Sequence, residues 1–68
     1  MQQGTIKTLT DKGFGFLTRE GESKDLFFHS SKLKNCRFDE LKKGDVLELD
    51  VEQGDKGPFA TNIHLISN

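Results

Sequence analysis

The chain has 68 residues, of which 32% are hydrophobic, and ten basic and eleven acidic residues give it a formal net charge of −1. This length predicts one domain, residues 1–68, with one small core. The single cysteine, Cys36, excludes an internal disulfide, and the pattern of cysteine and histidine shows no metal-ligand spacing, so we expect no metal and no cofactor. Because the sequence has neither a leader pattern nor an apolar run of membrane-spanning length, we expect a cytoplasmic protein with no membrane partner and no small-molecule substrate.

The first half of the chain predicts a meander of three short strands. They cover residues 4–9, 14–19 and 24–29, and the turn-forming segments 10–13 and 20–23 separate them. Because the side chains of an extended strand alternate between its two faces, the second and third strands have one aliphatic and one aromatic face. The aliphatic face holds Gly15, Leu17, Leu26 and Phe28, and the aromatic face holds Phe14, Phe16, Phe27 and His29.

A longer connection follows the third strand. Residues 30–33 predict one helical turn with Ser30 or Ser31 as its cap, and residues 34–43 have no period of their own and predict a loop.

The second half of the chain predicts two further strands. Leu47, Leu49 and Val51 alternate with acidic residues and mark a half-buried strand, and a turn at residues 54–58 leads into a fifth strand at about residues 59–66. Five strands with short turns and almost no helix predict an all-β fold, a five-stranded antiparallel Greek-key barrel of the OB-fold type.

The aromatic face of the second and third strands is the first candidate site. The aliphatic face makes the better core, so we expect three phenyl rings and an imidazole to be exposed on adjacent strands, where nucleic acid bases can stack on them. Residues 1–34 contain six basic and four acidic residues, whereas the rest of the chain contains four basic and seven acidic ones. The aromatic half is therefore the basic half, which gives phosphates a local positive field. The alternative is that the rings are buried, which is the commoner state of phenylalanine.

Five segments of the chain resemble the cold-shock domain proteins of the bacterial type, which are small five-stranded barrels that bind single-stranded RNA and DNA. In family order and at nearly family spacing stand residues 4–7 (GTIK), 12–17 (KGFGFL), 25–29 (DLFFH), 41–44 (LKKG) and 54–63 (GDKGPFATNI). The resemblance covers nearly the whole chain, and it implies that the residues matching the family's contact positions bind nucleic acid. These residues are Lys7, Lys12, Phe14, Phe16, Asp25, Phe27, His29 and Phe38.

The chain departs from the family pattern where family members carry further aromatic residues. Thr8 and Leu9 follow the lysine of the first strand in place of a tryptophan and a second aromatic residue, and Ser30 replaces an aromatic residue after the histidine. Because a stacked base is worth roughly 1–3 kcal/mol, we expect weaker binding than in a typical relative. Phe59 next to Pro58, in the predicted loop, is a candidate substitute ring, and its alternative role is to close the end of the barrel.

Each polar candidate has a functional and a structural interpretation. Lys7, Lys12 and, with less support, Lys56 either neutralise phosphates or are ordinary solvated charges. Asp25 either accepts a hydrogen bond from a base amino group or only solubilises the start of its strand. His29 beside Phe27 either stacks on or bonds to a base, or it is an ordinary surface imidazole or a satisfied polar residue. All of these are favoured over metal binding, because no partner ligands lie near it in the sequence.

Phe38 and a pairing of Cys36 with a histidine are two further candidate functional features. Phe38 either contacts a base or anchors its loop. A thiol–imidazole pair of Cys36 with His29 or His64 lacks a third, orienting group, so we expect no enzyme.

These observations predict a monomeric, non-catalytic protein whose partner is single-stranded RNA or DNA. Bases stack on the exposed rings with little sequence preference, because every base has a π-face. By resemblance, the biological role is that of an RNA chaperone or a regulator of transcription or translation. The alternative is a small barrel that uses the same surface to bind proteins and has lost much of its nucleic acid affinity.

Overall fold

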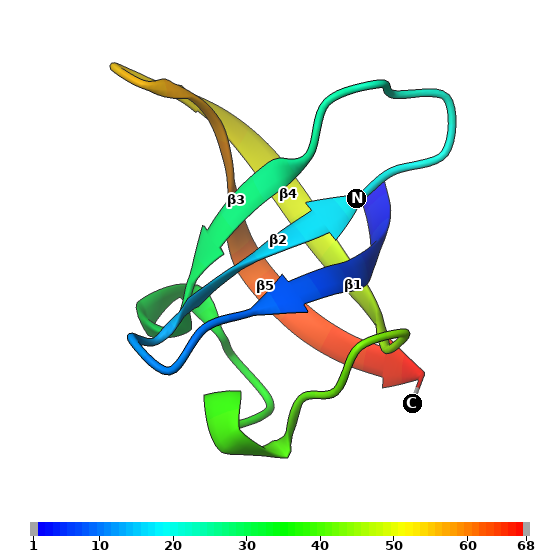
Figure 1. The fold of residues 1–68 in the computed structure, drawn as a ribbon, viewed down its shortest axis with the longest axis vertical. Coiled ribbons are helices and arrows are strands. Elements are labelled where there is room, and N and C mark those ends of the chain that lie inside the picture. Colours follow the sequence, from blue (N-terminus) through cyan, green and yellow to red (C-terminus); the bar gives the residue numbers. More distant parts are fainter. Residues whose placement is uncertain (1, 68) are drawn as a thin grey trace.

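The computed structural model describes residues 2–67, which form five strands and two short 3-10 helices (Figure 1). None of the helices formed by these residues has the length and apolar character of a membrane span. In chain order the elements are β1 (Gln2–Leu9), β2 (Phe14–Thr18), β3 (Leu26–His29), η1 (Ser30–Lys32), η2 (Phe38–Glu40), β4 (Val46–Gly54) and β5 (Gly57–Ser67).

The expected strands are all present, but three local predictions were wrong. The cap of η1 is His29, whose side chain accepts a hydrogen bond from the Ser31 N–H, and not Ser30 or Ser31. The predicted loop 34–43 contains the helix η2. The last turn has only the residues 55–56, because Gly54 and Gly57 already pair with each other in the β4–β5 hairpin.

The five strands form one sheet that closes on itself in the order β1-β2-β3-β5-β4. Four of the five neighbouring pairs are antiparallel, but β3 and β5 are parallel, with Phe27 opposite Phe59. The all-β, five-stranded fold is therefore confirmed, and the prediction of a wholly antiparallel sheet was wrong. The reason is geometric: strand directions cannot alternate all the way around a closed ring with an odd number of strands.

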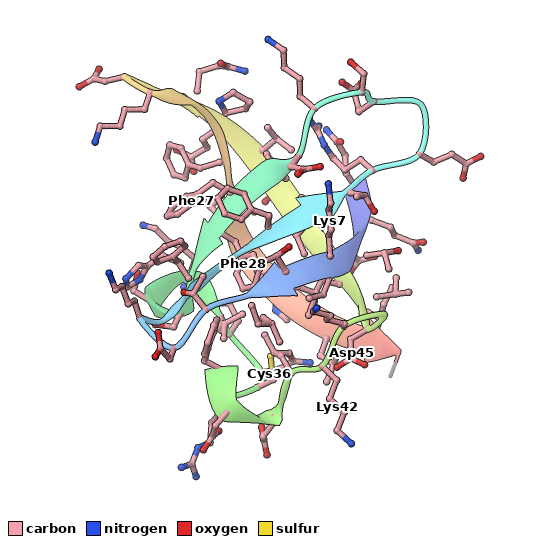
Figure 2. All side chains as sticks on the ribbon, viewed as in Figure 1. Lys7, Phe27, Phe28, Cys36, Lys42 and Asp45 are labelled. Atoms are coloured by element: carbon pink, nitrogen blue, oxygen red, sulfur yellow. The ribbon has the colours of Figure 1, made fainter. Side chains whose placement is uncertain are left out.

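The predicted division of β2 and β3 into two faces is confirmed. Phe16 lies opposite Phe27, and Leu17 opposite Leu26, so cross-strand partners project from the same face. Figure 2 shows Phe27 on the outside of β3 and Phe28 on the inside of the closed sheet. The core is aliphatic except for this one ring and consists of Ile6, Leu17, Leu26, Phe28, Leu41, Leu47, Leu49, Ala60 and Ile63.

Gly15 allows β2 to pack closely against its neighbours. A Cβ atom at this position would lie 2.5 Å from the carbonyl oxygen of Thr8 and 2.7 Å from Cε1 of Phe28. Both distances are far below van der Waals contact, so only a glycine fits at position 15 of β2. Phe14 and Phe16 stand on either side of Gly15 in the sequence and therefore project from the opposite, outer face.

Polar side chains tie the long connection between β3 and β4 to the closed sheet. The side-chain amide of Asn35 donates to the carbonyl of Leu65 and accepts from its N–H, so it pairs with β5 as another strand would. Asp45 is only 3% exposed, and its carboxylate accepts a 2.9 Å hydrogen bond from the N–H of Lys42 (Figure 2). Asn35 therefore ties the connection to β5, and the bond between Asp45 and Lys42 closes a local turn just before β4.

Candidate nucleic-acid interface

Three phenyl rings and one imidazole form the outer face of β2 and β3, and we call Phe14, Phe16, Phe27 and His29 the aromatic platform. The ring centroids of Phe14 and Phe27 are 5.5 Å apart, those of Phe16 and Phe27 are 5.9 Å apart, and those of Phe14 and Phe16 are 6.2 Å apart. Phe27 is 36% exposed, and the other two phenyl rings are half-buried against it. The rings support one another in edge and tilted contacts and still present apolar area to solvent.

The imidazole of His29 is held in a fixed orientation at one corner of the platform. Its Nδ1 accepts a hydrogen bond from the Ser31 N–H at 3.1 Å and lies 3.0 Å from the Ser31 hydroxyl. A neutral imidazole that accepts at Nδ1 carries its proton on Nε2, so Nε2 is the nitrogen that can donate. Because His29 lies opposite Phe14 in the sheet, the ring extends the row of aromatic groups.

A second row crosses the sheet through the middle of the platform. Thr8 lies opposite Phe16, Phe16 opposite Phe27, and Phe27 opposite Phe59, so the row spans β1, β2, β3 and β5. Phe59 therefore belongs to β5, as the strand predicted at about residues 59–66 requires, and not to the loop before it. The missing ring of the first strand falls at Thr8 only, since Leu9 packs against the core.

An open groove of about 590 Å³ continues this row past Phe27. Its walls are Phe16 and Phe27 on one side and residues 54–59 of the β4–β5 hairpin on the other. Sequence reasoning identified Phe59 and Lys56 here but missed the glycines and Pro58 that complete the wall. A two-residue turn between Gly54 and Gly57 is the signal that would have placed them in a hairpin.

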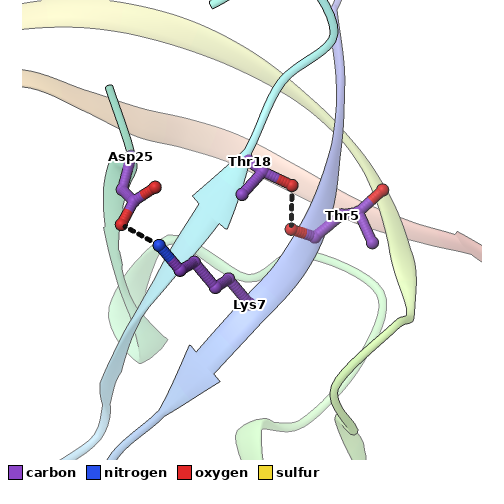
Figure 3. Close-up of polar contacts among 4 residues, drawn as sticks. All are labelled: Thr5, Lys7, Thr18 and Asp25. Atoms are coloured by element: carbon purple, nitrogen blue, oxygen red, sulfur yellow. Dashed lines mark hydrogen bonds and ion pairs between the residues drawn. The ribbon is translucent and has the colours of Figure 1, made fainter. Parts of the chain in front are cut away.

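Of the three candidate lysines, one is paired. Lys7 Nζ lies 3.0 Å from Oδ2 of Asp25, with the two side chains 54% and 38% exposed, and the lysine reaches across β2 (Figure 3). The register of β1 shifts between residues 6 and 8, which places Lys7 at an irregularity of the strand. Lys12 in the turn before β2 and Lys56 in the β4–β5 turn are exposed.

The family model of the 'Cold-shock' DNA-binding domain matches residues 2–66 of this chain. The chain belongs to the cold-shock domain family. Cold shock protein CspA of Staphylococcus aureus (strain USA300) is 42% identical over 64 residues, which are 93% of this chain and 96% of the relative. Cold shock protein 2 of Lactiplantibacillus plantarum is 45% identical over the same shares of the two chains. The sequence motifs therefore identified the family correctly.

A solved structure has the same fold. The structure titled "drosophila Unr CSD456" superposes with a TM-score of 0.79 at 33% identity and covers 96% of this chain. This cold-shock domain spans 26% of that longer chain. The closed five-stranded sheet is thus an architecture that it shares with a solved cold-shock structure.

Phe38 of this cold-shock domain lies apart from the aromatic platform. It begins η2, packs against the core, and has its ring centroid 6.1 Å from that of Phe28, the ring inside the closed sheet. This position favours the interpretation that Phe38 anchors its loop.

Cys36 is half-buried, and burial raises the pKa of its thiol above the ordinary value of 9.0, although a hydrogen bond to the backbone of Leu65 acts in the opposite direction. A raised pKa keeps the thiol protonated and makes it a poor nucleophile. Among residues 2–67, no three histidine, cysteine, aspartate or glutamate side chains are grouped so that they could hold a metal ion.

Proposed function

We propose that this cold-shock domain is a non-catalytic binder of single-stranded RNA or DNA and that bases stack on its aromatic platform. The observation that carries the proposal is the outward position of Phe14, Phe16 and Phe27, while aliphatic residues and Phe28 fill the core. A small soluble domain gains little by leaving such rings in water, and contiguous exposed apolar surface generally marks a binding site. Each stacked base contributes roughly 1–3 kcal/mol.

The charged residues and the rings have different roles: the lysines contact phosphates, and the rings stack on bases. Lys7, Lys12 and Lys56 stand around the platform and neutralise phosphates, which carries no sequence information. Phe59 adds a fourth phenyl ring in line with Phe16 and Phe27 and compensates for Thr8. The Asp25 carboxylate holds Lys7 in position, and its second oxygen is available to a base amino group.

The resulting activity is that of an RNA chaperone. The protein acts as a monomer, and its fold is an OB-type barrel. One chain supplies every ring of the platform, so no second copy is needed to complete it. Stacking with little sequence preference traps unpaired strands and disfavours RNA secondary structure. Release without ATP requires weak binding, which suits a platform that has Thr8 at the position where the resemblance implies a stacking ring.

A salt titration tests the proposal. Fluorescently labelled hexathymidylate is titrated with the protein, and log K is expected to fall linearly with log salt at a slope of about −2 if three phosphates are neutralised. The matched control is Ile66→Ala, which truncates an exposed apolar side chain at the far end of β5. The control should bind as the wild type does. If the wild type shows no binding at low salt, the proposal is wrong and the platform is better explained as a protein-binding surface.

A further inference from the structure

The groove at the β4–β5 hairpin is continuous with the aromatic platform. Phe16 and Phe27 belong to the platform and also form one wall of the groove, and Phe59 forms part of the other wall. A base stacked on Phe27 therefore lies next to this groove, whose lining is apolar except for Asp55 and Lys56. A nucleobase has flat apolar faces, so the next base of a strand that is already on the platform suits this groove.

The hairpin wall of the groove is preformed. A Cβ atom at Gly54 would lie 2.9 Å from Cε1 of Phe59, so the phenyl ring rests directly against the backbone of residue 54. Gly57 has a φ of +120°, a conformation that side-chain-bearing residues rarely adopt, and it pairs with Gly54 at the end of the hairpin. The ring of Phe59 is thus supported from behind, and little ordering entropy is lost when a ligand contacts it.

The β1 side of the sheet offers no comparable surface. Thr8 ends the row of rings there, and the Lys7–Asp25 ion pair crosses β2 (Figure 3). A single strand that leaves the platform therefore finds its next apolar contact across β3 and β5, and not on β1. At that end Lys56 is exposed and within the hairpin that lines the groove, although Asp55 beside it carries the opposite charge.

We infer that the bound strand follows the row of Phe16, Phe27 and Phe59 and seats one nucleobase in the groove, so that the binding site ends at the β4–β5 hairpin and not on β1. The base stacks against the supported ring of Phe59, and Lys56 contacts the phosphate of the same nucleotide. This inference rests on the proposed function, because the strand reaches the groove only by way of the platform.

The inference is tested by pairing protein variants with abasic oligonucleotides. Hexathymidylates in which one base at a time is missing are titrated against the wild type, Phe59→Ala and Ile66→Ala. We expect Phe59→Ala to weaken binding of the complete oligonucleotide by about 5- to 150-fold, the contribution of one stacked base. We also expect the penalty for one particular abasic position to disappear in this variant. Phe59→Leu retains apolar volume without the π-face and should show the same pattern if Phe59→Ala does not fold.

The outcomes separate the two claims. If the wild type binds, Phe27→Ala weakens binding, and Phe59→Leu keeps both the wild-type affinity and every abasic penalty, the inference is wrong while the proposed function stands. If the wild type does not bind at all, the proposed function fails first. Amide chemical shifts give a second measurement. Addition of hexathymidylate should change the amide chemical shifts of Gly54 and Gly57 more than that of Thr8, and the reverse order would contradict the inference.

Discussion

Truncation of two adjacent phenylalanines should affect different properties: Phe28→Ala mainly the stability of the fold, and Phe27→Ala mainly the affinity for oligonucleotides. Phe28 is fully buried, so Phe28→Ala removes a core ring and is expected to cost about 3–5 kcal/mol of unfolding free energy. A core of this size supplies only about 3–5 kcal/mol in total, so the variant should be largely unfolded. Phe27 is 36% exposed and loses mainly its contacts with two neighbouring rings, so Phe27→Ala should cost about 1–2 kcal/mol.

The effect of Phe27→Ala on binding should exceed its effect on stability. Loss of one stacking position predicts a decrease in affinity for hexathymidylate of about 5- to 150-fold. Because the chain has no tryptophan or tyrosine, urea unfolding is best followed by far-UV circular dichroism, and affinity by polarisation of a labelled oligonucleotide. The reasoning is refuted if Phe27→Ala lowers the unfolding free energy as much as Phe28→Ala does, since Phe27 would then be a structural ring.

Three further predictions follow from single contacts. Gly15→Ala should lower the unfolding free energy by about 1–3 kcal/mol because its Cβ has no room, whereas Gly4→Ala, whose Cβ would make contacts of 3.4 Å, should change it by less than about 1 kcal/mol; equal urea midpoints would contradict this. Asp25→Asn should remove the ion pair that positions Lys7 and lower oligonucleotide affinity at low salt by up to about fivefold, and a higher affinity would mean that Asp25 only neutralises Lys7. Burial raises the pKa of Cys36, so iodoacetamide should modify the native thiol more slowly at about pH 8 than the urea-unfolded thiol. The modification rate of the native thiol should still rise above pH 9.0. A rate that levels off below pH 9.0 would argue against burial of the thiol.

The two faces of β2 and β3 could be predicted from the sequence because the alternation of side chains is a local property of an extended backbone. Knowing only that residues 14–18 and 26–29 are strands is enough to place Phe27 outside once Phe28 is inside. The same local logic failed at η1, where the side chain of His29 acts as the cap in place of a serine hydroxyl. A histidine acceptor at this position is not part of the usual pattern of helix starts.

The position of Phe59 was decided by closure of the sheet. Its place beside Phe27 depends on β5 returning between β3 and β4, which is a property of the whole ring and not of any short segment. The contact of Lys7 with Asp25 across β2 and the packing of Phe38 on Phe28 likewise join residues that are far apart in the chain.

The sequence by itself therefore determined the strands, the aromatic face and the family, because backbone geometry and motif spacing act over a few residues. Only the tertiary structure decided that Phe59 joins this face beside Phe27. The reason is that β5 reaches β3 only when all five strands meet, and the contacts formed then offset the entropy lost in closing the long connection between β3 and β4.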